Sequence, residues 1–304
     1  MSRLNPFLLL LVLLWASAAQ ASTAQVVLLM GDTGDAYAEF AESFAVEAAR
    51  RNLSFSILQG NASLANAELV VAVGVSAAHT ALNSNVPVLC VLLSKSSFEK
   101  LQHDLRAGRS ISLGSAIYMD QPVKRQLELI NVALPQSKHI GVLSSAQSGD
   151  MPTLRKAVAE SRFVLHEEHT DSPESIHRNL QSILQDSDVL LTIPDAQIYN
   201  TMTLRNILLT TYRSRVPVIG LSPAYVKAGA LCAVFSTPSQ IAPQAVTMAK
   251  QFLESGHLSA AQYPGEFEVM VNQQVAHSLG LEMKDNALLL AQIKAAGNIL
   301  GKNK

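Results

Sequence analysis

The most informative part of the sequence for the fold begins with Glu68-Leu-Val-Val-Ala-Val-Gly-Val-Ser76. An alanine-rich helical stretch follows, and then Val86-Pro-Val-Leu-Cys-Val-Leu-Leu-Ser94. About 120 residues later the pattern returns as Asp188-Val-Leu-Leu-Thr-Ile-Pro-Asp195, a longer helical stretch and Val216-Pro-Val-Ile-Gly-Leu-Ser-Pro223. Runs made almost entirely of Val, Leu, Ile and Ala are typical of strands covered on both faces in a parallel α/β sheet. Ligands bind such sheets at the carboxyl ends of the strands, where the polar loops of both copies lie. The repeat therefore predicts two similar lobes whose polar edges face each other.

The rest of the chain extends this pattern. Apolar strand-like runs alternate with amphipathic helical stretches over the whole length, which indicates an α/β fold of two Rossmann-like, doubly wound lobes. Three stretches, near Tyr118, Ser236 and Pro264, are candidates for a three-segment hinge between the lobes. Three crossings of this kind would let the lobes close on a ligand. The predicted lobes are residues 22–119 with 237–261 and residues 120–236 with 262–304.

Element boundaries follow from the same patterns. One long helix is expected from about Tyr199 to Arg213, and another from Pro238 to about Glu254, where Gly256 stops it. The expected strands are residues 26–30, 54–58, 69–73, 88–93, 115–120, 139–144, 163–167, 189–193, 216–221, 229–236 and 267–271.

The amino terminus has the pattern of a secretory signal peptide over residues 1–21. Arg3 gives a weakly basic start, Phe7 to Trp15 form an apolar segment, and Ala19-Gln-Ala21 is a small-x-small cleavage site. The apolar run is shorter than the roughly 20 residues that a spanning helix needs. We therefore expect cleavage near Ala21, a periplasmic location and no membrane insertion after cleavage; an uncleaved membrane anchor is the alternative.

Charge and cysteine content exclude several classes of function. Removing Arg3 with the signal peptide from the 23 basic residues leaves 22 against 24 acidic ones, a net charge of −2. A chain this close to neutrality has no electrostatic basis for holding a nucleic acid or an anionic membrane. Cys90 and Cys232 lie inside apolar runs, so we expect buried free thiols, with a disulfide as the alternative in an oxidising compartment.

Motifs for catalysis, cofactors and metals are absent or incomplete. Gly31-Asp-Thr-Gly-Asp35 follows a strand but lacks the spacing and the lysine of a phosphate-binding loop. His166-Glu-Glu-His169 has its histidines three apart, whereas zinc proteases place them four apart on a helix. The sequence has no G-x-S-x-G elbow. We therefore predict no catalytic residue, no cofactor and no metal site.

Polar residues just past predicted strand ends are the candidate ligand-binding residues. Hydroxyl groups there suit hydrogen bonding to a small polar ligand, although serine also caps helices routinely. Tyrosines near these loops offer a ring and a hydroxyl, or else pack beneath the loops. Aspartates there either bind a ligand ammonium or cap the next helix. The candidates are Asp32, Ser76, Ser94, Tyr118, Asp120, Ser144, Asp195, Tyr199, Ser222 and Tyr225.

Three segments resemble one known family. They are Gln121-Pro-Val-Lys-Arg-Gln-Leu-Glu-Leu-Ile130 before His139-Ile-Gly-Val-Leu143, the Val216 to Leu231 region, and Val271-Asn-Gln-Gln-Val-Ala-His-Ser-Leu-Gly280. Together they resemble ABC-transporter substrate-binding proteins of the type 1 periplasmic binding fold, in the group related to tryptophan- and tyrosine-binding proteins. Members commonly have an acidic or aromatic residue and then a glycine where this chain reads Phe235-Ser-Thr-Pro-Ser-Gln240.

The resemblance implies a ligand held in the cleft between two lobes. By position, it places Asp32, Ser76, Ser94, Ser144, Asp195 and Ser222 on loops that face this cleft. The expected function is that of a monomeric solute-binding protein that presents a small polar ligand to a membrane permease. A sensory or accessory protein that acts on a receptor or outer-membrane system is the alternative, and an enzyme on the same fold is the least favoured class.

Overall fold

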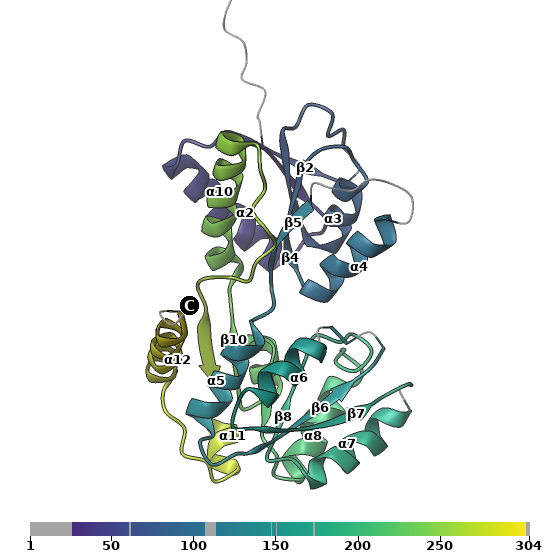
Figure 1. Cartoon of the computed structure of the whole chain (residues 1–304), viewed down its shortest axis with the longest axis vertical. Coiled ribbons are helices and arrows are strands. Elements are labelled where there is room, and N and C mark those ends of the chain that lie inside the picture. Colours follow the sequence, from purple (N-terminus) through teal and green to yellow (C-terminus); the bar gives the residue numbers. More distant parts are fainter. Residues whose placement is uncertain are drawn as a thin grey trace, which may run out of the picture.

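The computed structural model describes residues 26–60, 62–106, 114–146, 148–149, 151–172 and 174–301; the predicted signal peptide lies outside them. The chain forms two lobes, one above the other in Figure 1, each built on its own sheet. Lobe 1 has a five-stranded parallel sheet in the order β2-β1-β3-β4-β5. Its strands are β1 (Val26–Met30), β2 (Phe55–Gln59), β3 (Leu69–Val73), β4 (Val88–Leu93) and β5 (Gly114–Tyr118).

Helices cover both faces of the lobe 1 sheet. The apolar stripe of α2 (Asp35–Arg50) packs with α10 (Pro238–Ser255) on one face, where Phe40 and Phe44 are fully buried. The other face is covered by α3 (Gly74–Leu82) and α4 (Lys95–Arg106). The sheet is therefore doubly wound, as the fully buried pattern of β1, β3 and β4 requires.

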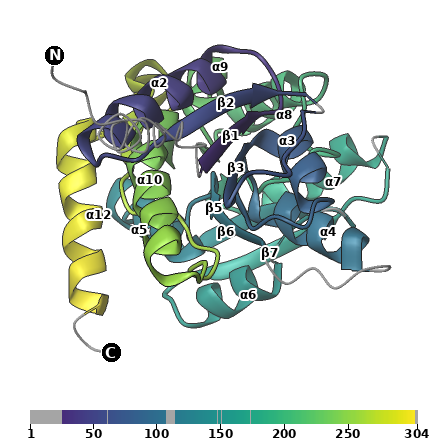
Figure 2. The same ribbon diagram turned by 90° about the horizontal axis from the view of Figure 1, so that it is seen from above.

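Lobe 2 has a six-stranded sheet in the order β11-β10-β9-β8-β6-β7, parallel except for the antiparallel edge strand β11. Its strands are β6 (His139–Ser144), β7 (Val164–His169), β8 (Val189–Leu191), β9 (Val218–Gly220), β10 (Cys232–Phe235) and β11 (Glu268–Val271). Its helices are α5 (Val123–Ala133), α6 (Met151–Ala159), α7 (Ser175–Gln185), α8 (Leu204–Arg213), α9 (Pro223–Ala228), α11 (Gln273–Ser278) and α12 (Asn286–Gly301). Figure 2 shows α12 along one side of the molecule.

Local sequence explains why α10 starts where the chain re-enters lobe 1. The Thr237 hydroxyl accepts the backbone N–H of Gln240, and the Gln240 side chain accepts the backbone N–H of Thr237. This capping box satisfies two of the backbone donors at the helix start, and Pro238 at the first position lacks an N–H that would need a partner. Gly256 ends the helix in a left-handed conformation with φ 72°.

The chain passes between the two sheets three times, after β5, after β10 and before β11. One buried side chain connects these segments, because the Gln121 amide donates to Ser236 Oγ at 2.9 Å and its oxygen accepts from Arg125 at 2.5 Å. Ser236 Oγ in turn donates to the Glu266 carbonyl at 2.6 Å, and Arg125 also donates to the Pro264 carbonyl at 3.1 Å. We call these five residues the hinge network.

The structure differs from the expected helix boundaries on one side of lobe 2. Helix α8 begins at Leu204, five residues later than expected from Tyr199. The Asn200 side chain accepts the backbone N–H groups of Met202 and Thr203, which holds the intervening residues in turns. The short helix α9 was not expected, because it consists of only six residues between two apolar strands.

Both cysteines are free and buried, Cys90 in the lobe 1 sheet and Cys232 in the lobe 2 sheet, as expected. Burial raises the pKa of the Cys232 thiol to about 12, which keeps it protonated. Within the part of the chain that the structure describes, no helix is both long enough and apolar enough to cross a bilayer.

Candidate ligand-binding cleft

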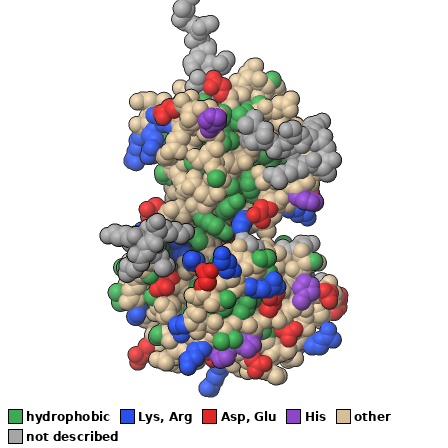
Figure 3. Space-filling model, viewed as in Figure 1, with side chains coloured by type: hydrophobic (Ala, Val, Ile, Leu, Met, Phe, Trp, Pro, Cys, Tyr) green, Lys and Arg blue, Asp and Glu red, His purple; other side chains and the backbone are tan. Residues whose placement is uncertain are grey.

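Two adjoining cavities lie between the lobes, at the carboxyl ends of the parallel strands. The inner chamber, next to the hinge, has a volume of about 410 Å³, and the outer chamber about 850 Å³. Both are lined by Ser96 of α4 in lobe 1 and by Gly149 of the loop after β6 in lobe 2. A Cβ on Gly149 would lie 3.2 Å from the Cβ of Ser96, so the lobes meet here across the cleft. Figure 3 shows apolar side chains at the waist between the two halves.

The inner chamber is walled mainly by apolar side chains from both lobes and from the hinge. Its polar lining consists of the serines at the start of α4 together with Lys95, Asp120, Gln121, Gln126 and Ser222. Its apolar lining is Val75, Leu92, Leu93, Met119, Val123, Met151, Leu154, Ile193, Pro194 and Leu221, with Tyr263 beside them. A concave, mostly apolar site with a few fixed polar groups is typical of small-molecule binding.

An irregularity in β4 shapes the lobe 1 wall. The pairing of β4 with β5 shifts register between Val91 and Leu93, and Leu92 has a positive φ of 55°. A β-bulge of this kind disrupts the ladder locally and changes the direction of a side chain near a site. A non-glycine residue in this conformation costs about 1–3 kcal/mol, so the surrounding structure must hold it in place. Leu92 lies in the wall of the inner chamber.

Two hydrogen-bonding groups fix the start of α4 at the cleft. Ser94 Oγ accepts the backbone N–H of Ser97 at 3.0 Å and also bonds the hydroxyls of Ser96 and Ser97. Asp120 Oδ2, from the first hinge segment, accepts the backbone N–H of Lys95 at 2.6 Å. Burial raises the pKa of Asp120 to about 6, against the opposing effect of that hydrogen bond. Asp120 therefore joins the hinge to lobe 1 and carries a negative charge into the chamber wall at neutral pH.

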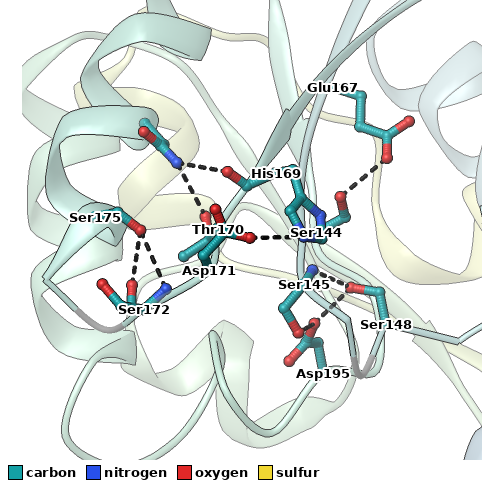
Figure 4. A network of polar contacts seen from close by, with 11 residues as sticks. Ser144, Ser145, Ser148, Glu167, His169, Thr170, Asp171, Ser172, Ser175 and Asp195 are labelled. Carbon is teal, nitrogen blue, oxygen red and sulfur yellow. Dashed lines mark hydrogen bonds and ion pairs between the residues drawn. The ribbon is translucent and has the colours of Figure 1, made fainter.

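Asp195 organises the lobe 2 wall of the outer chamber. Its Oδ2 accepts the hydroxyls of Ser145 at 2.6 Å and Ser148 at 2.5 Å, which point toward it in Figure 4. Its Oδ1 accepts the backbone N–H groups of Gln197 at 2.9 Å and Ile198 at 3.2 Å. With four donors already bound, this buried carboxylate joins the loop after β6 to the turn after β8.

Ser144 has a different role from its neighbour. Figure 4 shows its side chain turned toward Glu167, to which it donates at 2.9 Å. Glu167 is also bound by Arg155 at 2.8 Å, and these partners outweigh burial, so the pKa of Glu167 is below its usual value. Ser144 therefore belongs to a polar cluster between β6, β7 and α6 and lines neither chamber.

Two predicted tyrosines line the outer chamber. Tyr199 is buried, and its hydroxyl has no hydrogen-bond partner among the described residues. Burial raises the pKa of Tyr199, and the same cause raises that of Tyr225. Both side chains are therefore neutral and contribute mainly ring surface to this wall.

The other predicted residues divide into two groups. Ser94, Asp120 and Ser222 line the inner chamber, and Ser94 and Asp195 line the outer one. Tyr118 lines neither chamber, because its ring packs in the lobe 1 core against Phe98 and Tyr263. Asp32 and Ser76 are exposed at the carboxyl edge of the same sheet, outside both cavities.

Several lining residues were not among the predicted ones. Gln121 and Gln126 reach the inner chamber because the chain enters α5 there, and Met119 and Met151 complete its apolar wall. The polar run Lys95-Ser-Ser97 directly after a buried strand was a usable signal for the lobe 1 wall. The methionines gave no such signal, since apolar residues near element ends are more often core.

The predicted absence of a metal site stays a prediction. Across the described ranges, no three His, Cys, Asp or Glu side chains lie close enough to hold a metal ion. His166 bonds the ring of His139 at 2.9 Å, and His169 pairs with Asp171 at 3.1 Å. The two histidines of the His166-Glu-Glu-His169 motif therefore have separate partners.

Solved structures share this architecture. A substrate-binding protein with adhesive properties from Clostridium difficile, in its ligand-free open form, matches with a TM-score of 0.67 and 16% identity, over 87% of this chain and 97% of that one. A conserved domain protein from Vibrio cholerae matches with a TM-score of 0.60 and 19% identity, over 89% and 98%. An ABC domain from Streptococcus pneumoniae in complex with L-Trp matches with a TM-score of 0.58 and 15% identity, over 85% and 96%. At these identities the likeness establishes the fold.

Comparison of the sequence with models of known protein families identifies the family of this chain. No curated protein matches the chain. The family model described as ABC transporter substrate binding protein matches residues 47–294, which is most of the chain. The matched range includes both sheets except β1, all three hinge segments and every residue that lines the two chambers. The chain therefore belongs to the family of ABC transporter substrate-binding proteins.

Proposed function

We propose that this protein is exported to the periplasm, captures a small ligand between its lobes and delivers it to an ABC-type permease. The observation that carries the proposal is the pair of chambers lined from both lobes and the hinge. A ligand there contacts both lobes at once and therefore binds the closed form more tightly than the open form. Binding shifts the equilibrium toward the closed form by this difference in affinity.

The moving bodies in this proposal are residues 22–119 with 237–261 and residues 120–236 with 262–304. The hinge network supports a rotation about one compact point, because Gln121 and Ser236 connect the three crossing segments. The permease would recognise the surfaces of both lobes in the relative arrangement that they have in the closed form. The protein acts as a monomer and performs no chemistry on the ligand.

Retained ligand is the most direct test. The protein, purified from periplasmic extract without denaturation, is measured by native mass spectrometry before and after unfolding. We expect an additional mass that is released on unfolding and that, when added back, raises the melting temperature of the stripped protein. A protein without any retained mass, and without a melting shift across amino acids, amines, carboxylates, sugars and nucleosides, would contradict the proposal.

Delivery is tested separately in cells. Deletion of the gene should abolish uptake of the retained compound, and the wild-type gene should restore it. Uptake that persists in the deletion strain would remove the permease from the proposal and leave ligand binding intact. Amino-terminal sequencing of the exported protein, with a mature end near Ser22 expected, tests the signal peptide.

A further inference from the structure

The inner chamber combines an apolar wall with two charged side chains, Asp120 and Lys95. Met119, Val123, Met151 and Leu154 belong to the apolar part of that wall. Sugars and other polyols need a hydrogen-bond partner for each hydroxyl group, because a polar group left unpaired against such a wall loses its bonds to water without replacement. The wall therefore fits a ligand whose body is apolar.

Asp120 is the one acidic side chain among the described residues that line this chamber. Only its Oδ2 is used, by the backbone N–H of Lys95; its Oδ1 accepts no hydrogen bond from the described residues. The Lys95 ammonium pairs with Glu99 at 3.7 Å, and its positive charge also lowers the pKa of the Asp120 carboxyl. The carboxylate of Asp120 thus retains one oxygen for a donor from the ligand.

Among the described residues that line the inner chamber, a ligand carboxylate has only the Lys95 ammonium as a cationic partner, and that group is already paired with Glu99. None of the lining residues named for the two chambers is an arginine, and the two lysines there are Lys95, paired with Glu99, and the more distant Lys100 of the outer chamber. A carboxylate next to Asp120 would also be repelled by it. The charge arrangement favours a protonated nitrogen without an accompanying acid group.

From this juxtaposition, and resting on the proposed function, we infer that the inner chamber binds an amine: an apolar body in the chamber and a protonated nitrogen on Asp120 Oδ1. Gln121 lies next to Asp120 in the chamber wall and holds the hinge network. An ammonium bound at Asp120 therefore lies beside the residues about which the lobes rotate.

A set of matched compounds tests the inference by calorimetry on the ligand-stripped protein. Phenethylamine supplies the ring and the ammonium; phenethyl alcohol lacks the charge, hydrocinnamate reverses it, phenylalanine adds a carboxylate, and ethylamine lacks the ring. We expect phenethylamine to bind at least about tenfold more tightly than each of the others, because a charge-assisted hydrogen bond and ring burial each contribute about 1.5–3 kcal/mol. Phenylalanine or hydrocinnamate binding more tightly than the amine would overturn the inference.

Two variants locate the anchor. Asp120→Asn keeps the shape and an acceptor for Lys95, and should weaken phenethylamine about 10- to 100-fold while leaving phenethyl alcohol within about threefold. Glu128→Gln makes the same change in charge on α5 next to α12, where it lines neither chamber, and should leave the affinity for the amine unchanged. If both variants lose the same amount of affinity for phenethylamine, the effect comes from the overall charge of the protein, and the assignment of the ammonium to Asp120 is wrong.

The outcomes separate this inference from the proposed function. If a retained ligand lacks a protonatable nitrogen, the amine assignment is wrong and the solute-binding function stands. If the five compounds give no heat, the amine assignment is wrong; the proposed function itself fails only if, in addition, no ligand is retained and none of the wider compound classes shifts the melting temperature. The compound series needs only the wild-type protein, so it decides the question even if Asp120→Asn does not fold.

Discussion

Replacing Ser236 by alanine tests the hinge network directly. The substitution removes one hydroxyl from a site that is 6% exposed, so almost no apolar contact is lost. The hydroxyl accepts from Gln121 at 2.9 Å and donates to the Glu266 carbonyl at 2.6 Å. Each buried hydrogen bond contributes about 1 kcal/mol net, so we expect the free energy of unfolding to fall by about 2 kcal/mol. For a chain of this size that corresponds to a melting temperature lower by about 4 °C.

The assay is urea unfolding followed by circular dichroism, with a control serine of the same chemistry. Ser182 is exposed and makes one side-chain bond, to Glu168 on β7 at 2.9 Å, so Ser182→Ala should change stability by less than about 0.5 kcal/mol. If Ser236→Ala loses no more stability than this control, the two hydrogen bonds of Ser236 do not stabilise the hinge. A double-mutant cycle with Gln121→Ala adds a second condition: a coupling near zero would show that the two side chains do not act together.

Three further predictions concern packing, thiol chemistry and pH. Gly141→Ala should lower the free energy of unfolding by about 1–3 kcal/mol, because its Cβ would lie 2.5 Å from a buried serine hydroxyl. Gly265→Ala, whose Cβ would have its nearest neighbour at 3.9 Å, should have little effect in the same urea titration. Cys90 and Cys232 are free and buried, so a thiol reagent should modify neither in the native protein and both in denaturant; rapid native labelling would contradict their burial. Because burial raises the folded pKa of Asp120 to about 6, the folded state binds its proton more tightly than the unfolded state, and stability from this group falls as pH rises from about 4 to 6. The melting temperature of Asp120→Asn should therefore rise relative to that of the wild type between pH 5 and pH 7. If the difference between the two melting temperatures is the same at both pH values, the pKa of Asp120 is not raised.

The sequence predicted the lobe 1 sheet well because burial on both faces alone explains the composition of its central strands. The expected strands at 26–30, 69–73 and 88–93 coincide with β1, β3 and β4, all of them continuous apolar runs buried on both faces. The predicted family and the two-lobed α/β fold are confirmed by the family match and by the solved structures. The bulge at Leu92 was not predictable, since it depends on how β4 pairs with β5 and not on the identity of the residue.

The candidate site was harder to predict. The sequence indicates that a residue follows a strand, but it does not indicate which side chains that residue bonds or packs against. Ser144 and Ser145 are neighbours, yet one bonds Glu167 and the other Asp195. Tyr118 was expected near the cleft, but its neighbours Phe98 and Tyr263 keep its ring in the core. Such choices depend on side chains that lie far apart in the sequence.

The packing of α10 on α2 has a consequence for the order in which the protein assembles. Residues about 200 positions apart meet there, as in the bond from the Ser239 backbone to Glu39. Phe40 and Phe44 can be covered only after the chain through β10 and α10 has been synthesised. Contacts this distant in sequence form slowly, because a long loop must close before they are made. Lobe 1 is therefore translated first but completes its core only after strands β6 to β10 of lobe 2 have been synthesised, and lobe 2 in turn needs β11 and α12 to complete its own core.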